Sequence, residues 1–279
     1  MKMSDVTSLG RLPDPRYPTN RTIMALSLAV GAAGAIFQWL GGTALLDGVN
    51  WAIGAGFAVF LAWALGRELD PDHDLSAFVA AGLALVAVLL AEAPPLMVIL
   101  WLLVVLRLVN RTVGLPAKPL DSLSVLGLGA WLTWQGDWIV GLVTAVAFLL
   151  DGMLPPPLRY HLLVSGLALV ATALLTILQG GTASGDGLTA TIAISSLAVA
   201  GLFLIVIANS RELQAVGDAT GEPLHARRVQ AAQILALATA LLFAWRAGEA
   251  GVLAMLPLWA AMLGVSLYRL AILFLSRAR

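Results

Sequence analysis

Ten apolar runs follow one another from Thr22 toward the C-terminal end of the chain, and short polar segments separate them. Each run is bounded by Pro, Gly, Asn or charged residues, which is typical of helix ends. The runs cover roughly residues 22–46, 50–65, 75–92, 95–109, 122–134, 138–150, 161–178, 188–208, 229–245 and 251–275. A helix perpendicular to the bilayer needs about 20 residues to cross its hydrocarbon core. We therefore predict an all-α fold, a polytopic integral membrane helix bundle with about ten transmembrane helices.

The fifth and sixth runs, residues 122–134 and 138–150, are shorter than a full crossing requires. They either cross the membrane as two short helices or form one re-entrant hairpin. The second arrangement leaves eight crossings plus the hairpin. Both arrangements place the two termini on the same side, so the sequence leaves this choice open.

Composition excludes a large soluble domain. Of the 279 residues, 60% are hydrophobic and only 11% are charged, whereas a soluble domain of this size needs far more charge to cover its surface. No polar segment is longer than the first 21 residues, which are too polar and too rich in proline for a secretory signal. The predicted organisation is a cytoplasmic N-terminal tail over residues 1–21 and a single transmembrane helical domain over residues 22–279.

The basic residues are distributed unevenly between the two sides of the membrane. If the chain crosses ten times, only Arg246 of the 16 Lys and Arg residues faces one side. Cytoplasmic segments carry an excess of Lys and Arg, so both termini are expected in the cytoplasm and the chain in a plasma or inner membrane. The other basic residues are Lys2, Arg11, Arg16, Arg21, Arg67, Arg107, Arg111, Lys118, Arg159, Arg211, Arg227, Arg228, Arg269, Arg277 and Arg279.

The turns on the opposite side are short, and each has one acidic residue. These residues are Asp47, Glu92, Asp137, Asp186 and Glu249. All three histidines, His73, His161 and His225, fall on the predicted cytoplasmic side. Any chemistry that the protein performs is therefore expected at the cytoplasmic face.

The net charge and the cysteine count narrow the possible partners. A formal net charge of zero gives no electrostatic basis for binding nucleic acid. The absence of cysteine excludes disulfides, thiolate catalysis and cysteine-ligated metals. The expected partners are the lipid bilayer and anionic lipid head groups at the cytoplasmic face, and the oligomeric state is left open.

The stretch "LDPDHD" after the second run allows two interpretations. In the first, Asp70 is the N-cap of the third helix, and Asp72 and Asp74 lie in its first turn, where the helix dipole favours negative charge. In the second, the three carboxylates hold Mg²⁺, which prefers hard oxygen ligands and substrate phosphates. Alternate residues at a helix start diverge by about 200° around the axis, which favours the cap. The basic residues that would bind the phosphates in the second interpretation are Arg107, Arg111, Lys118 and Arg227.

The position of this stretch resembles that of the first acidic loop in intramembrane prenyltransferases of the UbiA type, which also follows the second span. That family has an Asn-Asp-x-x-Asp-x-x-x-Asp pattern, whereas the aspartates here alternate and no Asn precedes them. The second acidic loop of the family would fall at "LLDGMLPPPLRYH", which has only Asp151. The resemblance is therefore one of position and not of motif.

The other polar segments have simpler interpretations. Arg107 and Arg111 are four residues apart, so we expect both to extend toward anionic head groups. The segment over residues 209–228 is the longest internal polar loop and is expected to be a solvated connection. His161 is expected to be an interfacial anchor at a helix start.

Few polar residues lie inside the apolar runs. Those closest to mid-span include Gln38, Ser195, Ser196 and Thr239. Hydrogen bonds between helices would explain them, although a transport pathway would need the same groups. Arg269 is expected to extend to the cytoplasm, and without a buried acid no proton relay is evident.

Three functions remain open. The favoured one is a permease-like transporter of a small or amphipathic solute, because the chain resembles the drug/metabolite transporter architecture in the number and length of its spans and in its termini. The first alternative is a membrane-embedded, Mg²⁺-dependent enzyme acting on a phosphorylated lipid or prenyl substrate at the cytoplasmic face. The second alternative is a membrane scaffold subunit. Only the enzyme function would require Mg²⁺. For the other two functions the sequence assigns no cofactor.

Overall fold

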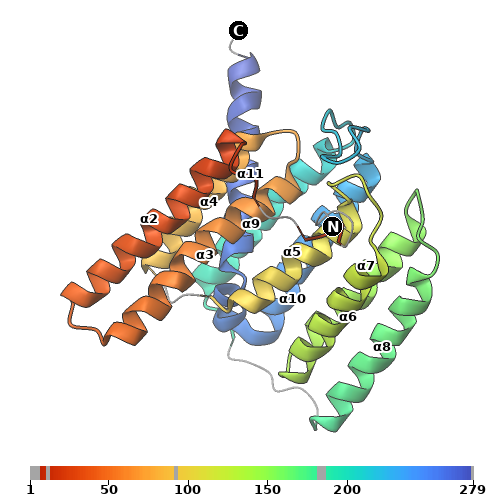
Figure 1. Ribbon diagram of the computed structural model, residues 1–279, viewed down its shortest axis with the longest axis horizontal. Coiled ribbons are helices and arrows are strands. Elements are labelled where there is room, and N and C mark those ends of the chain that lie inside the picture. The colour runs from red at the N-terminus through yellow and green to blue at the C-terminus, as the bar shows by residue number, and fades with distance from the viewer. Residues whose placement is uncertain (1–6, 11–12, 91–93, 181–186, 278–279) are drawn as a thin grey trace. The chain divides into compact units, whose positions relative to one another are not determined.

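The computed structural model describes residues 7–10, 13–90, 94–180 and 187–277 (Figure 1). Within these ranges the chain forms ten α-helices, one for each apolar run. The only β-structure there is an isolated bridge between Val216 and Pro223. The helices are α2 (Pro18–Leu40), α3 (Leu45–Leu69), α4 (Asp74–Leu90), α5 (Leu96–Asn110), α6 (Pro119–Trp134), α7 (Trp138–Met153), α8 (His161–Leu178), α9 (Ala190–Asn209), α10 (Ala226–Ala254) and α11 (Leu256–Arg277).

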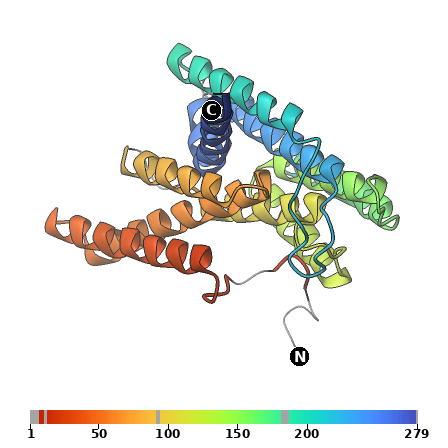
Figure 2. The same cartoon turned by 90° about the horizontal axis from the view of Figure 1, so that it is seen from above.

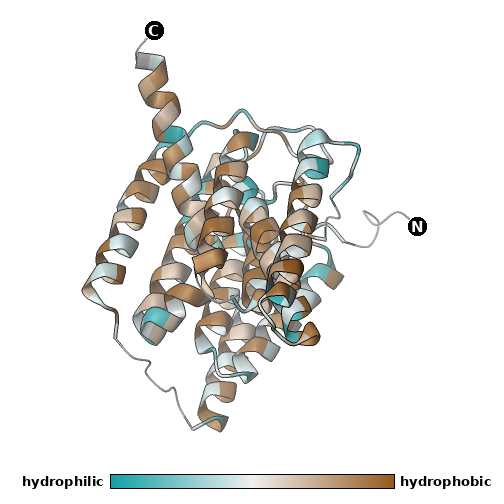
Figure 3. Ribbon diagram, turned by 90° about the vertical axis from the view of Figure 1, so that its left-hand side faces the viewer, coloured by the Kyte–Doolittle hydropathy of each residue, from teal (hydrophilic) through white to brown (hydrophobic). Residues whose placement is uncertain are grey.

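Six of these helices, α2, α3, α8, α9, α10 and α11, are long and apolar enough to cross a membrane. Helices α4, α5 and α7 are apolar but shorter. Large apolar side chains also remain exposed, such as Leu28 at 73% and Leu163 at 74%, as expected for surfaces that face lipid. Figure 3 shows apolar residues along most of the helices. The prediction of a helical, multi-pass membrane protein is confirmed at this level, and the number of crossings stays a prediction.

The chain divides into two compact units. Unit 1 comprises residues 1–11, 100–193 and 207–252, and unit 2 comprises residues 12–99, 194–206 and 253–279. The predicted boundary between a tail and a membrane domain at residue 21 stays a prediction. Each unit is described by itself.

Small residues bring the helices of unit 2 together. Helix α2 runs beside α3, and α4 packs on both α3 and α11 (Figures 1 and 2). Two core clusters consist largely of alanine, and Ala62, Ala84 and Ala260 form one of them. A Cβ atom at Gly264 of α11 would lie 2.7 Å from Cα of Ala80 in α4, so the two helices touch backbone to backbone. Such contacts are typical of helix packing in membranes.

Unit 1 contains the helices that position the candidate site. Helix α7 packs along α8, and α6 packs on both. The indole N–H of Trp101 in α5 donates to Oγ1 of Thr144 in α7 over 2.9 Å, which links α5 to this group. Helices α6 and α7 have 16 residues each, and a helix of that length is about 24 Å long. Crossing and re-entry therefore both remain predictions for this pair.

The break predicted between the ninth and tenth runs falls at a kink inside α10. The ninth run was expected to end near residue 245, but α10 continues to Ala254. The helix changes direction at Gly248, whose φ of 58° suits a residue without a Cβ atom. This kink lies in the predicted gap at residues 246–250, which contains Arg246 and Glu249, and α10 includes the residues after it up to Ala254.

Candidate functional site

The carboxylate of Asp151 is the centre of a buried polar cluster in unit 1. Asp151 lies in the last turn of α7 and its side chain is fully buried. Arg111 donates to it through Nε and Nη2, both over 2.8 Å, and Nη1 of Arg228 donates over 2.7 Å. Nδ1 of His161 lies 2.7 Å from Oδ2 of Asp151. A buried charge is stable only when it is paired and hydrogen-bonded, and this carboxylate has three side-chain partners.

Arg111 reaches the cluster because helix α5 ends just before it. Asn110 is the last residue of α5, and Arg111 follows it with a φ of 52°, which is uncommon for a residue with a Cβ atom. Its N–H still donates to the carbonyl of Arg107 over 3.1 Å, so the helix ends at this left-handed residue. The side chain turns back over α7, where Nη1 donates to the carbonyl of Pro156 over 3.0 Å.

Arg228 satisfies carbonyl groups at the ends of two helices. It lies in the first turn of α10 and is 1% exposed. Its guanidinium donates to the carbonyl of Val109 at the end of α5 over 2.9 Å, and to that of Leu154, just after α7, over 2.6 Å. The carbonyls of Pro155 and Pro156 accept further bonds over 2.9 and 2.8 Å. The last carbonyls of a helix have no partner inside it, so Arg228 fastens α10 to the ends of α5 and α7.

His161 extends the cluster toward α6. It is the first residue of α8, it is fully buried, and Phe148 packs against its ring. Nε2 of His161 lies 2.8 Å from Oγ of Ser122 in α6, and the hydroxyl of Tyr160 lies 3.3 Å from the same oxygen. The expectation that His161 is an interfacial anchor is wrong, because both ring nitrogens contact buried polar groups.

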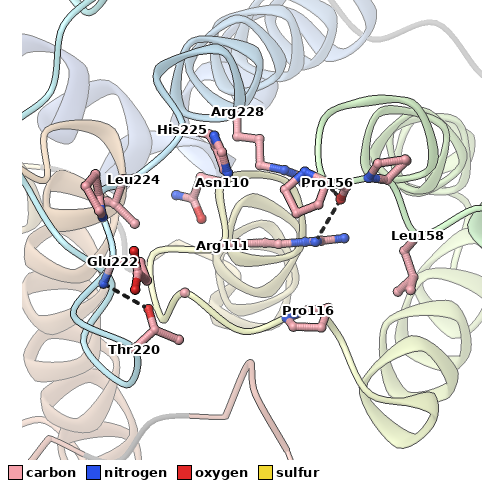
Figure 4. A pocket seen from close by; sticks show the side chains of 13 residues that line it. Asn110, Arg111, Pro116, Pro156, Leu158, Thr220, Glu222, Leu224, His225 and Arg228 are labelled. Carbon is pink, nitrogen blue, oxygen red and sulfur yellow. Dashed lines mark hydrogen bonds between the residues drawn. The ribbon is translucent and has the colours of Figure 1, made fainter.

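A pocket of roughly 240 Å³ lies next to the two arginines (Figure 4). Arg111 and Arg228 are part of its wall, and the proline-rich segment after α7 forms one side of it. The opposite side comes from residues 220–225, including Glu222 and His225. The wall residues are Asn110, Arg111, Gly114, Pro116, Pro156, Pro157, Leu158, Thr220, Glu222, Pro223, Leu224, His225 and Arg228.

The arginine side of the pocket has an excess of positive charge. Two guanidinium groups share the single carboxylate of Asp151. A guanidinium has five N–H donors. In the described part of the chain Arg111 uses three of them, on Asp151 and Pro156, which leaves two for another acceptor. Arginine binds carboxylate and phosphate groups through such paired donors.

The loop before α10 was predicted to be a solvated connection, and most of its residues are exposed, but it also forms a docked hairpin, which we define as residues 215–224. The N–H of Leu224 donates to the carbonyl of Ala215 over 3.0 Å, and that of Gly217 donates to the carbonyl of Glu222 over 2.8 Å. The hairpin also bonds to the segment after α5, because the N–H of Ala219 donates to the carbonyl of Val113 over 3.0 Å. A Cβ atom at Gly217 would lie 2.7 Å from Cα of Gly114, so glycine is needed at this contact. The hairpin therefore forms a fixed wall of the pocket.

The acidic stretch forms a separate polar contact in unit 2. Asp70 is the residue after α3 and not the start of α4, which begins four positions later at Asp74, so the N-cap interpretation is wrong. The side chain of Asp70 is fully buried, and its Oδ1 accepts from Nη2 of Arg269 in α11 over 2.6 Å. Nδ1 of His73 lies 3.1 Å from the same oxygen. Arg269 therefore turns onto a buried acid, contrary to the expectation that it extends to the cytoplasm.

The three aspartates proposed for Mg²⁺ do not converge in the structure. Asp70 faces Arg269, whereas Asp74 forms an ion pair with Arg67. Asp72 lies in the turn between α3 and α4. Across the described ranges, no group of three or more His, Cys, Asp or Glu side chains is placed to hold a metal ion. The ion pairs of Asp70 and Asp74 join different helices, because Arg67 belongs to α3, Asp74 to α4 and Arg269 to α11.

Of the four basic residues proposed to bind phosphates, only Arg111 lines the pocket. Arg107 donates to the carbonyl of Leu9 over 3.1 Å, and Lys118 precedes α6 as its N-cap. Arg227 is exposed, whereas its neighbour Arg228 is buried in the site. The expectation that Arg107 and Arg111 extend together to head groups is wrong for Arg111, which is 7% exposed.

The mid-span polar residues do not form one group. Gln38 lies near the end of α2 and accepts from Oγ1 of Thr43 over 2.9 Å. Ser195 is exposed and Ser196 is buried, and both belong to unit 2. Thr239 belongs to unit 1 and donates to the carbonyl of Leu235 in its own helix over 2.7 Å. None of the four lines the pocket beside Arg111.

An ion pair also lies at the other end of the helices of unit 1. Nη1 of Arg246 is 3.1 Å from Oδ1 of Asp137, in the turn between α6 and α7. Burial raises the pKa of the Asp137 carboxyl, and the Arg246 guanidinium opposes that rise. Arg246 is the single basic residue predicted outside, and its partner is in a turn predicted on the same side. No protein-family model, curated protein or solved structure matches the chain.

Proposed function

We propose that this chain is a permease-like membrane protein that binds the anionic group of an amphipathic solute in the pocket beside Arg111. The observation that carries the proposal is the pair of N–H donors that Arg111 leaves unused within the described residues, at a pocket wall where two guanidiniums share one carboxylate. Phosphate and carboxylate groups fit such donors. The pocket volume of roughly 240 Å³ suits a head group and not a whole lipid.

The pocket also supports the proposed orientation. It is built from the segments after α5, after α7 and before α10. The charge asymmetry of the sequence assigns all three segments to the cytoplasmic side, and the structure brings them together in one unit. We therefore place the solute-binding end of unit 1 at the cytoplasmic face of a plasma or inner membrane, with both termini on that side.

Anionic lipid head groups are the partners that this proposal implies. A short alkyl phosphate represents their chemistry without forming a bilayer. Saturating binding to the folded state raises its stability, by about 2.7 kcal/mol when the ligand is at 100 times its dissociation constant. The purified protein in a neutral detergent is heated with increasing octyl phosphate or with octyl glucoside. Octyl phosphate is expected to raise the Tm to a plateau, and octyl glucoside is not.

The control variants separate the pocket from the rest of the surface. Leu224→Trp fills the pocket and leaves the bonds of Arg111 and Arg228 in place, so the Tm shift should disappear. Leu169→Trp adds the same side chain at an exposed position of α8, where the shift should remain. An equal shift in Leu224→Trp and wild type, or an equal shift with octyl glucoside, contradicts the proposal. Proteoliposomes then test transport: wild-type protein should move the alkyl phosphate across the bilayer, and Leu224→Trp should not.

A further inference from the structure

We propose that Ser122 is a nucleophile activated by His161, and that the protein cleaves carboxylic esters of amphipathic molecules at this serine. Oγ of Ser122 lies 2.8 Å from Nε2 of His161, and Nδ1 of the same ring lies 2.7 Å from Oδ2 of Asp151. A hydroxyl, an imidazole base and a carboxylate that orients the base are the three parts of an activated serine, and they are recognised by geometry on any fold. The three residues come from α6, α8 and α7 of one unit.

The hydrogen bonds fix which ring nitrogen can act as the base. The carboxylate of Asp151 can only accept, so Nδ1 of His161 carries a proton and donates it. In the neutral ring Nε2 then has a free lone pair, and it faces the hydroxyl of Ser122. Ser122 can therefore donate to Nε2, which is the arrangement needed to remove its proton during attack.

A purely structural serine in a helix would bond differently. Two buried hydroxyls in helices of this chain donate to the carbonyl four residues earlier, that of Thr133 over 2.8 Å and that of Ser266 over 2.7 Å. Ser122 has the equivalent carbonyl, that of Lys118, at the longer distance of 3.2 Å. Its shorter contact is the imidazole at 2.8 Å. The carbonyl of Lys118 could accept from this hydroxyl on its own. The hydrogen bond to His161 is therefore not needed to satisfy Ser122 within its helix.

Ser122 is also close to a surface that a substrate can reach. It is the fourth residue of α6 and is itself 5% exposed. The hydroxyl of Tyr160 is 3.3 Å away, and Tyr160 is 41% exposed. Leu123, the next residue of α6, is 64% exposed and can contact an acyl chain. A helix end of a membrane protein lies near the level at which amphipathic molecules carry their ester groups.

The reaction balances without a cofactor. Oγ of Ser122 bonds to the carbonyl carbon of the ester while its proton passes to Nε2 of His161. The bond from that carbon to the alkoxy oxygen breaks, and the proton moves to the departing alcohol. A water molecule then attacks the acyl-serine and gives a proton to Nε2. The bond from the acyl carbon to Oγ breaks, Nε2 returns the proton to Oγ, and the carboxylic acid and free Ser122 are released. The roles are those of nucleophile for Ser122, base and acid for His161, and positioning residue for Asp151.

This inference does not rest on the proposed anion binding, because Ser122 is not part of the pocket wall. The test uses an alkyl fluorophosphonate, which loses fluoride and leaves a phosphonyl group on an activated serine. Folded wild-type protein in detergent is incubated with the probe, and the adduct is located by mass spectrometry. One adduct is expected, on Ser122. The protein should also release nitrophenol from a nitrophenyl ester, and Ser122→Ala should lose both reactions.

Two further variants make the test specific. His161→Gln removes the base and should slow labelling by about 10²–10⁴-fold. Ser165→Ala removes another buried serine of the same unit, which donates to the carbonyl of Ala145. In this variant Ser122 should be labelled as fast as in wild type. No adduct on wild type, an adduct elsewhere, or an unchanged rate in His161→Gln overturns the proposal. If His161→Gln does not fold, Ser122→Ala decides alone, since it removes only a hydroxyl.

Discussion

At the scale of single residues, Arg228 is the side chain that joins Asp151 to the ends of two helices in unit 1. It bonds to Asp151 and to carbonyls at the ends of α5 and α7 at the same time. The planar guanidinium can do this because its donors point in several fixed directions. An ammonium group has three donors from one atom and cannot reach the same set.

Replacing Arg228 with Ala is therefore expected to lower the free energy of unfolding by about 3–5 kcal/mol, since breaking a buried ion pair leaves an uncompensated charge. Arg228→Lys should recover only part of the loss. The matched control is Arg227→Ala, which changes an exposed neighbour and should stay within about 0.5 kcal/mol. Denaturant unfolding in detergent measures all three. Equal stability of Arg228→Ala and Arg227→Ala would show that the buried contacts contribute nothing.

The residue scale is also where the sequence was least informative. Arg227 and Arg228 are adjacent in the sequence, and only their directions around the axis of α10 distinguish the exposed residue from the buried one. Arg228 lies next to Val229 and four positions before Ala232, which are both buried, so a careful count of the helical stripe could have found it. Asp70 is different. Its partner Arg269 is 199 residues away, and no local pattern indicates such a contact.

At the scale of helices, close approach in unit 2 depends on glycine and alanine. The backbones of α4 and α11 meet at Ala80 and Gly264. Gly82 lies one half-turn away in α4 and faces open space. We therefore expect a glycine-to-alanine substitution to have opposite effects on stability at positions 264 and 82.

Gly264→Ala is expected to lower the free energy of unfolding by about 1–3 kcal/mol, because the new Cβ atom would overlap the backbone of α4 and force the helices apart. Gly82→Ala should leave stability unchanged or raise it by up to about 1 kcal/mol, since alanine favours a helix more than glycine does. Thermal unfolding in detergent compares the two variants with wild type. A Gly264→Ala protein as stable as Gly82→Ala would mean that α4 and α11 are not in contact at this point.

The helices themselves were predictable to a large extent. Each apolar run became one helix, because a long apolar stretch can satisfy its backbone in lipid only as a helix or a closed barrel. The helix ends were less predictable. Helix α3 continues to Leu69 through Arg67 and Glu68, although these charged residues predict an end of the apolar run before them. The docked hairpin at residues 215–224 was missed because its backbone bonds to Val113 depend on a segment about 100 residues earlier.

At the scale of the whole molecule, the distribution of charge gives a topology that can be tested directly. The chain has no cysteine, so a single introduced thiol reports one position. Gly187 and Ala219 are both exposed, and the predicted orientation places them on opposite sides of the membrane. The turn at Gly185 and Asp186, which also belongs to the predicted outer side, lies outside the described residues.

In intact cells, a membrane-impermeant maleimide is expected to label Gly187→Cys and to label Ala219→Cys only after the membrane is opened. The physical reason is the excess of Lys and Arg in the segments around Ala219. Labelling is read from a mass shift on a gel. Labelling of Ala219→Cys alone in intact cells would invert the topology, and labelling of both would contradict the number of crossings between them.

The distance in sequence between Arg228 and its partners also determines the order in which these contacts can form during synthesis. Arg111 and Asp151 are 40 residues apart, whereas Arg228 follows Asp151 by 77 residues. At about 5–20 residues per second, Arg228 leaves the ribosome roughly 4–15 s after Asp151. Of the two arginines that bind Asp151, only Arg111 has been synthesised during that interval. The carbonyls after α7 do not yet have the hydrogen bonds that Arg228 donates to them. The growing chain thus contains an unfinished end of unit 1, which the arrival of α10 completes.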